Sequence, residues 1–319
     1  NGASLAWRPP SIVGRGHGSR GRTRSSTNAK LKQMVEPVMH NIRTRKIPFE
    51  FPEDIEPYWK PDMPEWSALL NGLSLTMPYL EPFLIRTIRE AAEQIEDPGL
   101  TADVKAFVEQ EAQHFSQHRK FNELIKSKGY GDLAKLEEDM EVYYARLDGS
   151  SLQKRMAYTS GFETMTIGLT RFLVNRRRWL FKDADPRVAS LMLWHIVEEA
   201  EHKSVAVDVY RAACPGYPAW VFGLFHGTFH VLFMAIRGAR SMLVRDGRFN
   251  LSSKLRLAGL VASFLVTWLP VLIKSLLPGH HPDHIEDPIW VREWIAEYND
   301  KEGVPLLDTS HDDIPARFA

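Results

Sequence analysis

The sequence contains a single cysteine, Cys214, among its 319 residues. One cysteine cannot form an intramolecular disulfide or a cysteine-rich zinc site, and it agrees with a reducing cytoplasm. The chain also has no excess of either charge, because Lys plus Arg and Asp plus Glu both number 40. A formal net charge of zero gives no argument for nucleic-acid binding, so we expect no nucleic-acid partner.

Strand signals are scarce as well, because few Val, Ile and Thr residues alternate and no Asn-Gly turn lies between two such runs. We expect four long helices instead, at about residues 66–96, 101–128, 151–181 and 186–213, with a short connecting helix at 132–147. Thr101 is the expected cap of the second helix. Asp185 is the expected cap of the fourth, with Pro186 at its first position.

The longest connection lies between the second and third helices, which is the wiring of ferritin-like bundles. The sequence therefore predicts an all-α fold, a ferritin-like four-helix bundle with additional C-terminal helices. We expect a flexible basic N-terminal arm in residues 1–45, the di-metal bundle in 46–215, extra apolar helices in 216–300 and a tail in 301–319.

Two apolar stretches, residues 219–236 and 257–273, flank a connector with six basic residues and one acid. Each stretch is marginal for spanning a bilayer, which needs about 20 apolar residues. One interpretation packs both on the bundle as core helices. The other is a monotopic hairpin on anionic lipid, and it predicts an apolar patch of Phe222, Phe225, Phe229, Leu265 and Trp268. We expect a cytoplasmic protein, with peripheral contact at the inner face of the membrane left open.

Two Glu-x-x-His motifs, Glu111 to His114 and Glu199 to His202, fall on the expected second and fourth helices. Residues three apart share one helix face, so both side chains of each motif can reach a metal on the bundle axis. Carboxylate oxygen with imidazole nitrogen suits iron or manganese. Two such motifs on alternate helices favour a metal site over the alternative of surface or interhelical salt bridges.

A di-metal bundle also needs a carboxylate from each of the other two helices. Glu81 and Glu163 are the candidates, because each lies among apolar neighbours, where an acid is costly unless it is paired or metal-bound. The alternative is a buried acid satisfied by Arg or Tyr. At about 1.5 Å per residue, Glu81 and Glu111 reach similar heights on either side of the turn at Pro98.

A third histidine lies on the same face of the fourth helix. His195, Glu199 and His202 are spaced by four and three residues and form one narrow stripe. His195 could therefore be a further ligand or a histidine of the core. On the second helix, His118 follows His114 by one turn and could orient a ligand or have a structural role alone.

These residues carry a resemblance to a known family. The run Trp194-His195-Ile196-Val197-Glu198-Glu199-Ala200-Glu201-His202-Lys203, with the four long helices, resembles the predicted metal-dependent hydrolases, which are similar to ferritin-like di-iron proteins. The His-x3-Glu-x2-His spacing also resembles the di-iron arylamine N-oxygenases, whose site has three histidines and four carboxylates. The ligands that the resemblance implies are Glu81, Glu111, His114, Glu163, His195, Glu199 and His202.

The favoured function is a di-iron carboxylate enzyme that activates O2 to oxidise an apolar or amine substrate. The alternatives are a metal-dependent hydrolase that uses a metal-bridging water, and a non-catalytic metal-binding protein with no substrate cavity beside the site. The implied cofactors are two metal ions, iron first and manganese or zinc as alternatives. We expect as partners a small lipophilic or amine substrate, an electron donor such as a ferredoxin or reductase, and a second copy of the chain in a homodimer.

Overall fold

The computed structural model describes residues 42–298 and 304–310, and in these ranges every regular element is a helix. The predicted all-α fold class is therefore confirmed. The helices are α2 (Pro64–Ser74), α3 (Met77–Ala92), α4 (Pro98–Ser127), α5 (Leu133–Asp148), α6 (Leu152–Asn175), α7 (Arg177–Phe181), α8 (Pro186–Glu201), α9 (Val205–Ala213), α10 (Tyr217–Arg245), α11 (Leu251–Ser275), the 3-10 turn η1 (Pro282–His284) and α12 (Ile289–Tyr298).

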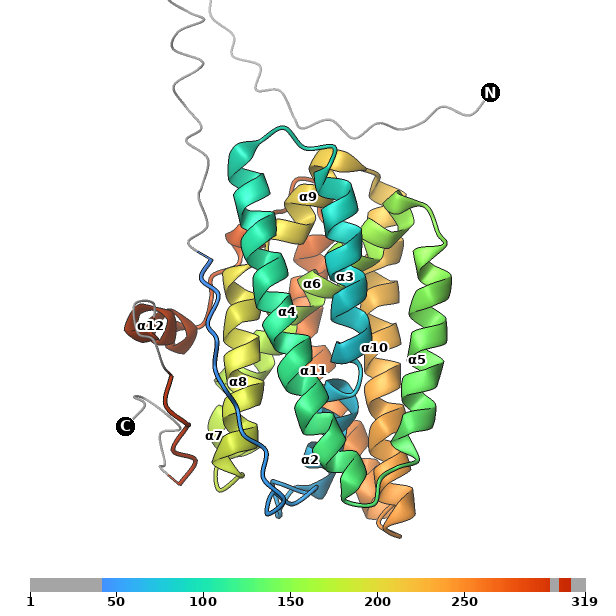
Figure 1. Ribbon diagram of the computed structural model, residues 1–319, viewed down its shortest axis with the longest axis vertical. Helices are drawn as coiled ribbons and strands as arrows, with labels where there is room; N and C mark the ends of the chain where they lie inside the picture. Colours follow the sequence, from blue (N-terminus) through green and yellow to red (C-terminus); the bar gives the residue numbers. More distant parts are fainter. Residues whose placement is uncertain (1–41, 299–303, 311–319) are drawn as a thin grey trace, which may run out of the picture.

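Four helices, α3, α4, α6 and α8, form the four corners of the bundle. Helix α3 packs on α4 and α6, and α8 packs on α6 and α4. Helix α5 lies in the connection between α4 and α6, at the outer edge of the bundle beside α3 and α10 (Figure 1). The longer connection therefore falls between the second and third helices of the bundle, as the sequence predicts.

The first expected helix, residues 66–96, is two helices rather than one. Helix α2 ends at Ser74 and α3 begins at Met77. Pro78 has no N–H to donate to the Ser74 carbonyl oxygen four residues earlier, so the backbone hydrogen bonds of α2 do not continue through it. Pro78 lies instead in the first turn of α3. The Thr76 hydroxyl donates to the Leu73 carbonyl oxygen at 2.7 Å and caps the break.

The helix caps are confirmed at one expected position and corrected at another. Asp185 caps α8, since its Oδ1 accepts from the Arg187 N–H at 2.9 Å. Helix α4 begins at Pro98, and its cap is Asp97 instead of Thr101, because Asp97 Oδ1 accepts from the Gly99 N–H at 2.8 Å. Pro98 favours this earlier start, since a proline at the first helical position loses no hydrogen bond.

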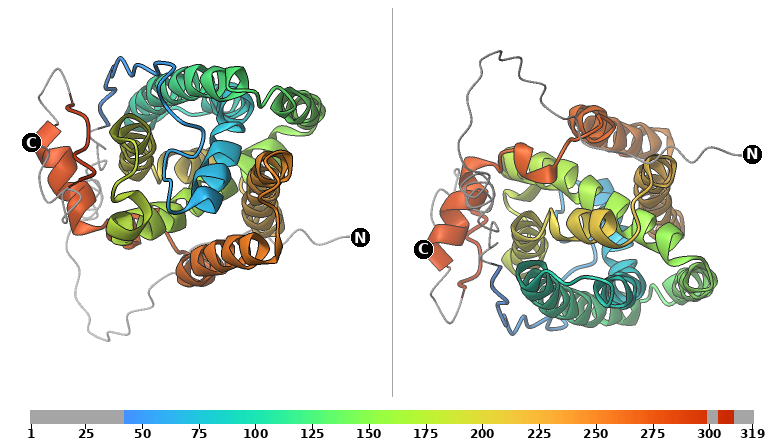
Figure 2. Two further views of the ribbon diagram at one scale, coloured as in Figure 1. Left: turned by 90° about the horizontal axis from the view of Figure 1, so that it is seen from below. Right: turned by 90° about the horizontal axis from the view of Figure 1, so that it is seen from above.

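Helices α10 and α11 pack on the side of α6 and α2 that faces away from α4 (Figure 2). Glycines allow α10 to approach both helices at backbone contact. A Cβ on Gly223 would lie 1.9 Å from the Ala157 carbonyl oxygen of α6, and a Cβ on Gly72 of α2 would lie 2.3 Å from the Ala235 carbonyl oxygen. One face of α10 is therefore part of the core.

The outer face of these two helices remains apolar and exposed. Phe222, Phe225 and Phe229 are 56%, 37% and 46% exposed, whereas Trp268 is buried. By length and composition alone, α10 and α11 could each cross a membrane. Of the five residues that the monotopic interpretation places on an exposed patch, Leu265 is half-buried. Trp268 is a correction, because it belongs to the same buried core cluster as Phe264.

Most of the expected N-terminal arm and part of the expected tail lie outside the described residues. Arg45, the last residue of the expected arm, is described and is 5% exposed. It lies beside the bundle, where its guanidinium binds carboxylates of α8.

Candidate metal centre

The seven side chains implied by the sequence come together inside the bundle in two neighbouring groups. In each group one oxygen or nitrogen atom per residue lies within 4.8 Å of the others. The first group is Glu81 from α3, His114 from α4 and His195 from α8, and the second is Glu111 from α4, Glu163 from α6, Glu199 from α8 and His202 at the end of α8.

Helix periodicity explains why α4 and α8 each contribute to both groups. Glu111 and His114 lie on one face of α4, and His195 and Glu199 lie on one face of α8. The two groups adjoin at Glu199, whose Oε1 is 2.9 Å from His195 Nε2 and 3.8 Å from His114 Nδ1. His202 is the C-cap residue of α8, and the chain turns there before α9 begins at Val205.

The centre is buried and contains many unpaired polar atoms. Six of the seven residues are at most 2% exposed, and His195 is 8% exposed. Nine buried atoms of the centre have no hydrogen-bond partner in the described structure: both oxygens of Glu81, Glu111 and Glu163, Oε2 of Glu199, Nδ1 of His114 and Nε2 of His202. An unpaired buried polar atom is costly unless something else binds it. Metal ions at this point would satisfy all nine, so the donor set fits a metal centre.

The buried carboxylates of the centre also favour the binding of cations. Burial, with repulsion between neighbouring carboxylates, raises the pKa of Glu81 and Glu163 well above the usual range and that of Glu111 to about 8. Burial opposes ionisation of Glu199 and His202 too, but their mutual attraction prevails, so the pKa of Glu199 falls and that of His202 rises. Four carboxylates thus meet with too little positive charge to balance them, which bound cations would supply.

A second layer of side chains orients two of the imidazoles. His202 Nδ1 donates to Gln110 Oε1 at 2.9 Å, so its Nε2 faces Glu111 Oε1 at 3.2 Å. His114 Nε2 donates to Glu198 Oε2 at 3.1 Å, which leaves Nδ1 facing the centre. Such partners fix the tautomer and ring orientation of a metal-ligating histidine.

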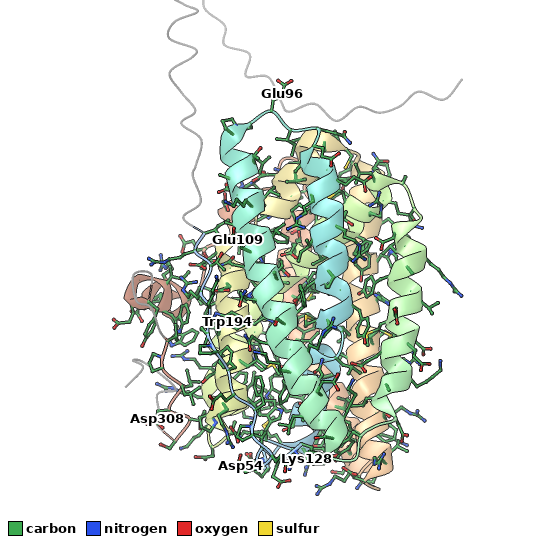
Figure 3. The ribbon with its side chains drawn as sticks, viewed as in Figure 1. Asp54, Glu96, Glu109, Lys128, Trp194 and Asp308 are labelled. Atoms are coloured by element: carbon green, nitrogen blue, oxygen red, sulfur yellow. The ribbon has the colours of Figure 1, made fainter. Side chains whose placement is uncertain are left out.

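One arginine pairs with the carboxylates Glu198 and Glu201 next to the centre. The Arg45 guanidinium binds Glu198 at 3.0 Å and Glu201 in a two-point contact at 2.7 Å. The Trp194 ring, labelled on α8 in Figure 3, packs edge-on against His114 with ring centroids 4.9 Å apart. These contacts cover the His114 side of the centre.

A chain of hydrogen bonds connects His195 to Asn122 and Ser74. Asn122 donates its amide to the Ser74 carbonyl oxygen at 2.9 Å, so its Oδ1 accepts from the Ser74 hydroxyl at 2.7 Å. The Ser74 hydroxyl then accepts from His118 Nδ1 at 2.7 Å. His118 Nε2 is left to accept from His195 Nδ1, also at 2.7 Å. On the other side of the ring, His195 Nε2 lies within hydrogen-bond distance of Glu199 Oε1, at 2.9 Å.

Three residues of the second layer have no role in the sequence-based interpretation: Arg45, Gln110 and Glu198. The burial argument that identifies Glu163 could also have identified Glu198, an acid that follows the apolar run of α8. Nothing in the sequence marks Gln110 or Arg45, because their partners lie 92 and 153 residues away along the chain.

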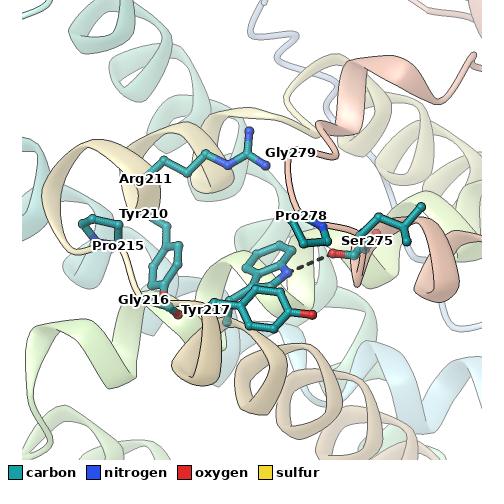
Figure 4. Close-up of a pocket in the computed structure, with 10 residues that line it drawn as sticks. Tyr210, Arg211, Pro215, Gly216, Tyr217, Ser275, Pro278 and Gly279 are labelled. Carbon is teal, nitrogen blue, oxygen red and sulfur yellow. Dashed lines mark hydrogen bonds between the residues drawn. The ribbon is translucent and has the colours of Figure 1, made fainter. Parts of the chain in front are cut away.

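A separate hollow lies at the turn between α9 and α10 and the C-terminal end of α11 (Figure 4). Its cavity volume is about 50 Å³, and the Trp220 Nε1 donates to the Ser275 carbonyl oxygen across its wall at 3.0 Å. None of the seven residues of the centre lines it, so we assign it no part in the chemistry of the centre.

Comparison with known proteins gives one match. The family described as predicted metal-dependent hydrolase matches residues 43–286, which include all seven residues of the centre and all four helices of the bundle. No curated protein and no solved structure matches the chain. On the extent of the family match, the chain belongs to the predicted metal-dependent hydrolase family.

Proposed function

We propose that the seven residues bind two metal ions and that this centre catalyses the hydrolysis of an ester or amide. The observation that carries the proposal is the set of nine unpaired donor atoms at one buried point, in a chain whose family is described as metal-dependent hydrolases. When bound, the ions would act as Lewis acids toward water and the substrate carbonyl. The water oxygen would bond to the acyl carbon while the C–O or C–N bond breaks, and a water proton would leave with the alcohol or amine.

The residues of the chain would have three tasks in this reaction. Glu199 lies between the two groups and would hold both ions, while Glu81 and Glu163 would each hold one. Gln110 and Glu198 would keep His202 and His114 oriented through their hydrogen bonds. The apolar surroundings would exclude bulk water and so strengthen every electrostatic contact in the centre.

A hollow beside the centre favours catalysis over metal storage. Its cavity volume is about 30 Å³, and it is lined by His195 and Glu199, by the polar side chains of Ser74, His118 and Thr166, and by apolar residues of α2, α3, α6 and α8. A non-catalytic metal-binding role predicts no such cavity.

O2-dependent oxidation at two iron ions is the second candidate. The donor set of four carboxylates and three imidazoles supports it, because hard oxygen and borderline nitrogen donors suit iron. The apolar wall of the hollow supports it too, since it would admit an unactivated hydrocarbon. This candidate requires an external electron donor, such as a ferredoxin or reductase.

The test uses the full-length chain, stripped with a chelator and reloaded anaerobically with Zn²⁺, Mn²⁺ or Fe²⁺. A hydrolase should cleave p-nitrophenyl esters with one of these metals and lose at least tenfold of that rate in Glu199→Gln. The control His226→Gln, on α10, should keep the rate. Rapid O2 uptake by the Fe²⁺ form with no ester cleavage would favour the second candidate, and neither activity with any metal would contradict both.

A further inference from the structure

Two hollows inside the molecule share part of their walls. The inner one, of about 30 Å³, is lined by polar side chains, among them His195 and Glu199, and by apolar side chains such as Phe162 and Leu173. Its other polar lining residues are Ser74, His118 and Thr166. The outer one, of about 50 Å³, lies between α2, α6, α10 and α11. The side chains that line both are Leu70, Leu73, Met165 and Leu169, so only these four side chains separate or join the two hollows.

The wall of the outer hollow suits hydrocarbon. It carries no charged residue, and Thr228 supplies its only hydroxyl. That hydroxyl already donates to the Leu224 carbonyl oxygen of α10 at 2.8 Å. A charged or polyhydroxylated substrate would lose its hydration here and gain no partners, which is unfavourable. A hydrocarbon chain would gain the free energy of leaving water, and it would meet polar side chains only in the inner hollow, where His195 and Glu199 lie with Ser74, His118 and Thr166.

The outer hollow opens toward the surface between α10 and α11. Leu232 on α10 and Val261 on α11 line it and are half-buried, whereas Phe172 on its inner side is buried. Beside this opening the outer face of α10 carries Phe229 and Phe233, which are exposed. An apolar molecule that reaches this face would thus find an apolar route inward.

We propose that the two hollows form one binding channel for a long-chain acyl compound. The chain enters between α10 and α11, passes Leu73 and Leu169, and places its carbonyl end at His195 and Glu199. The assignment of that end to catalysis rests on the proposed function, while the binding of the hydrocarbon does not. The channel therefore predicts that the ester or amide cleaved at the centre carries a long acyl chain.

Binding of a fluorescent fatty acid, dansylaminoundecanoic acid, to the full-length chain tests the channel with and without metal. Hexanoic, octanoic, decanoic and dodecanoic acids should displace it with increasing affinity, about tenfold for each pair of methylene groups. Leu169→Trp fills the junction of the two hollows and should weaken probe binding at least tenfold. Leu269→Trp, on the exposed face of α11 and outside both hollows, should bind as the wild type does.

Thermal unfolding and metal content are measured on the same variants, so that failure of the channel is distinguished from failure of the metal centre. If Leu169→Trp does not fold, Leu73→Phe replaces it at the same junction. Weaker probe binding by a folded, metal-loaded blocking variant supports the channel even if no ester is cleaved. Unchanged probe binding in that variant, or no gain with chain length, overturns it. Uptake from monomeric dodecanoic acid and uptake from phosphatidylcholine vesicles distinguish a soluble acyl compound from a membrane lipid, and either supports the channel.

Discussion

At the scale of single residues, helix periodicity accounts for much of the centre. Glu111 and His114 need only a regular helix to face one point, so their spacing could be read from the sequence. The pairing of His202 with Gln110 could not, because it depends on how α8 packs on α4. His195 is open between ligand and core histidine from the sequence, and the structure places its Nε2 beside Glu81 and Glu199, so its role as a ligand stays a prediction.

Removing His195 should release or loosen one metal ion while the fold survives. His195→Ala should lower metal content from about two ions per chain toward one, measured by mass spectrometry of the metal after gel filtration. His118→Ala should keep both ions at saturation but weaken metal affinity about 10–100-fold, because it removes only the partner that orients His195. His226→Ala is the matched control on α10. Unchanged metal content and affinity in both variants would show that His195 is a core histidine and not a metal ligand.

His281, which is not a residue of the centre, should make the free energy of unfolding depend on pH. Hydrogen bonds to Asp208 at 2.7 Å and an ion pair with Asp283 at 3.4 Å raise the pKa of His281 from 6.5 to about 9, and the His284 ring packs beside it. Because the folded state favours the protonated form, this stabilisation is fully present below about pH 6.5. It is lost as pH rises through about 9.

His281→Gln should therefore lower the melting temperature by a few degrees at pH 6 and have little effect at pH 10, since a hydrogen bond between charged groups contributes about 1.5–3 kcal/mol. Thermal unfolding followed by circular dichroism measures this. The control His284→Gln should show no such pH-dependent difference. An equal effect of His281→Gln at both pH values would mean that charge has no part in it.

At the scale of helices, the existence and order of the bundle helices follow from turn signals, while their breaks depend on position within the fold. Asp185 and Pro186 fix the start of α8 locally. The break after Ser74 places Pro78 at a helix start, which the apolar pattern of residues 66–96 alone does not reveal. The packing of α10 against α6 was one of two open interpretations, because a long apolar helix suits a core or a lipid surface equally.

Close approach of α10 to α6 should make one glycine indispensable. Gly223→Ala places a methyl group 1.9 Å from the Ala157 carbonyl oxygen and should destabilise the protein by about 1–3 kcal/mol. Gly259 on α11 has no neighbour within 4 Å, so Gly259→Ala should instead stabilise by about 0.5–1 kcal/mol through helix propensity. Urea unfolding of both variants measures this. A neutral Gly223→Ala would show that the two helices are further apart than described.

At the scale of the whole molecule, the apolar outer face of α10 and α11 should bind lipid. Exposed Phe225 and Phe229 lie on the same outer face as Arg240, an exposed cation of α10. We expect flotation with anionic vesicles, weakened by high salt and by the double variant Phe225→Glu, Phe229→Glu. The matched control changes Val142 and Trp179, exposed apolar residues of α5 and α7, to Glu. Equal flotation of both double variants would exclude this face as the lipid contact.

The central claim is that seven residues from four helices bind two metal ions in one centre. A crystal structure of the metal-loaded, full-length protein with anomalous data collected at the metal edge tests it most directly. We predict two anomalous peaks about 3.5–4 Å apart, with Glu199 near both, Glu81, His114 and His195 around one, and Glu111, Glu163 and His202 around the other. No peak at this point, or a single peak bound elsewhere on the protein, would contradict the account.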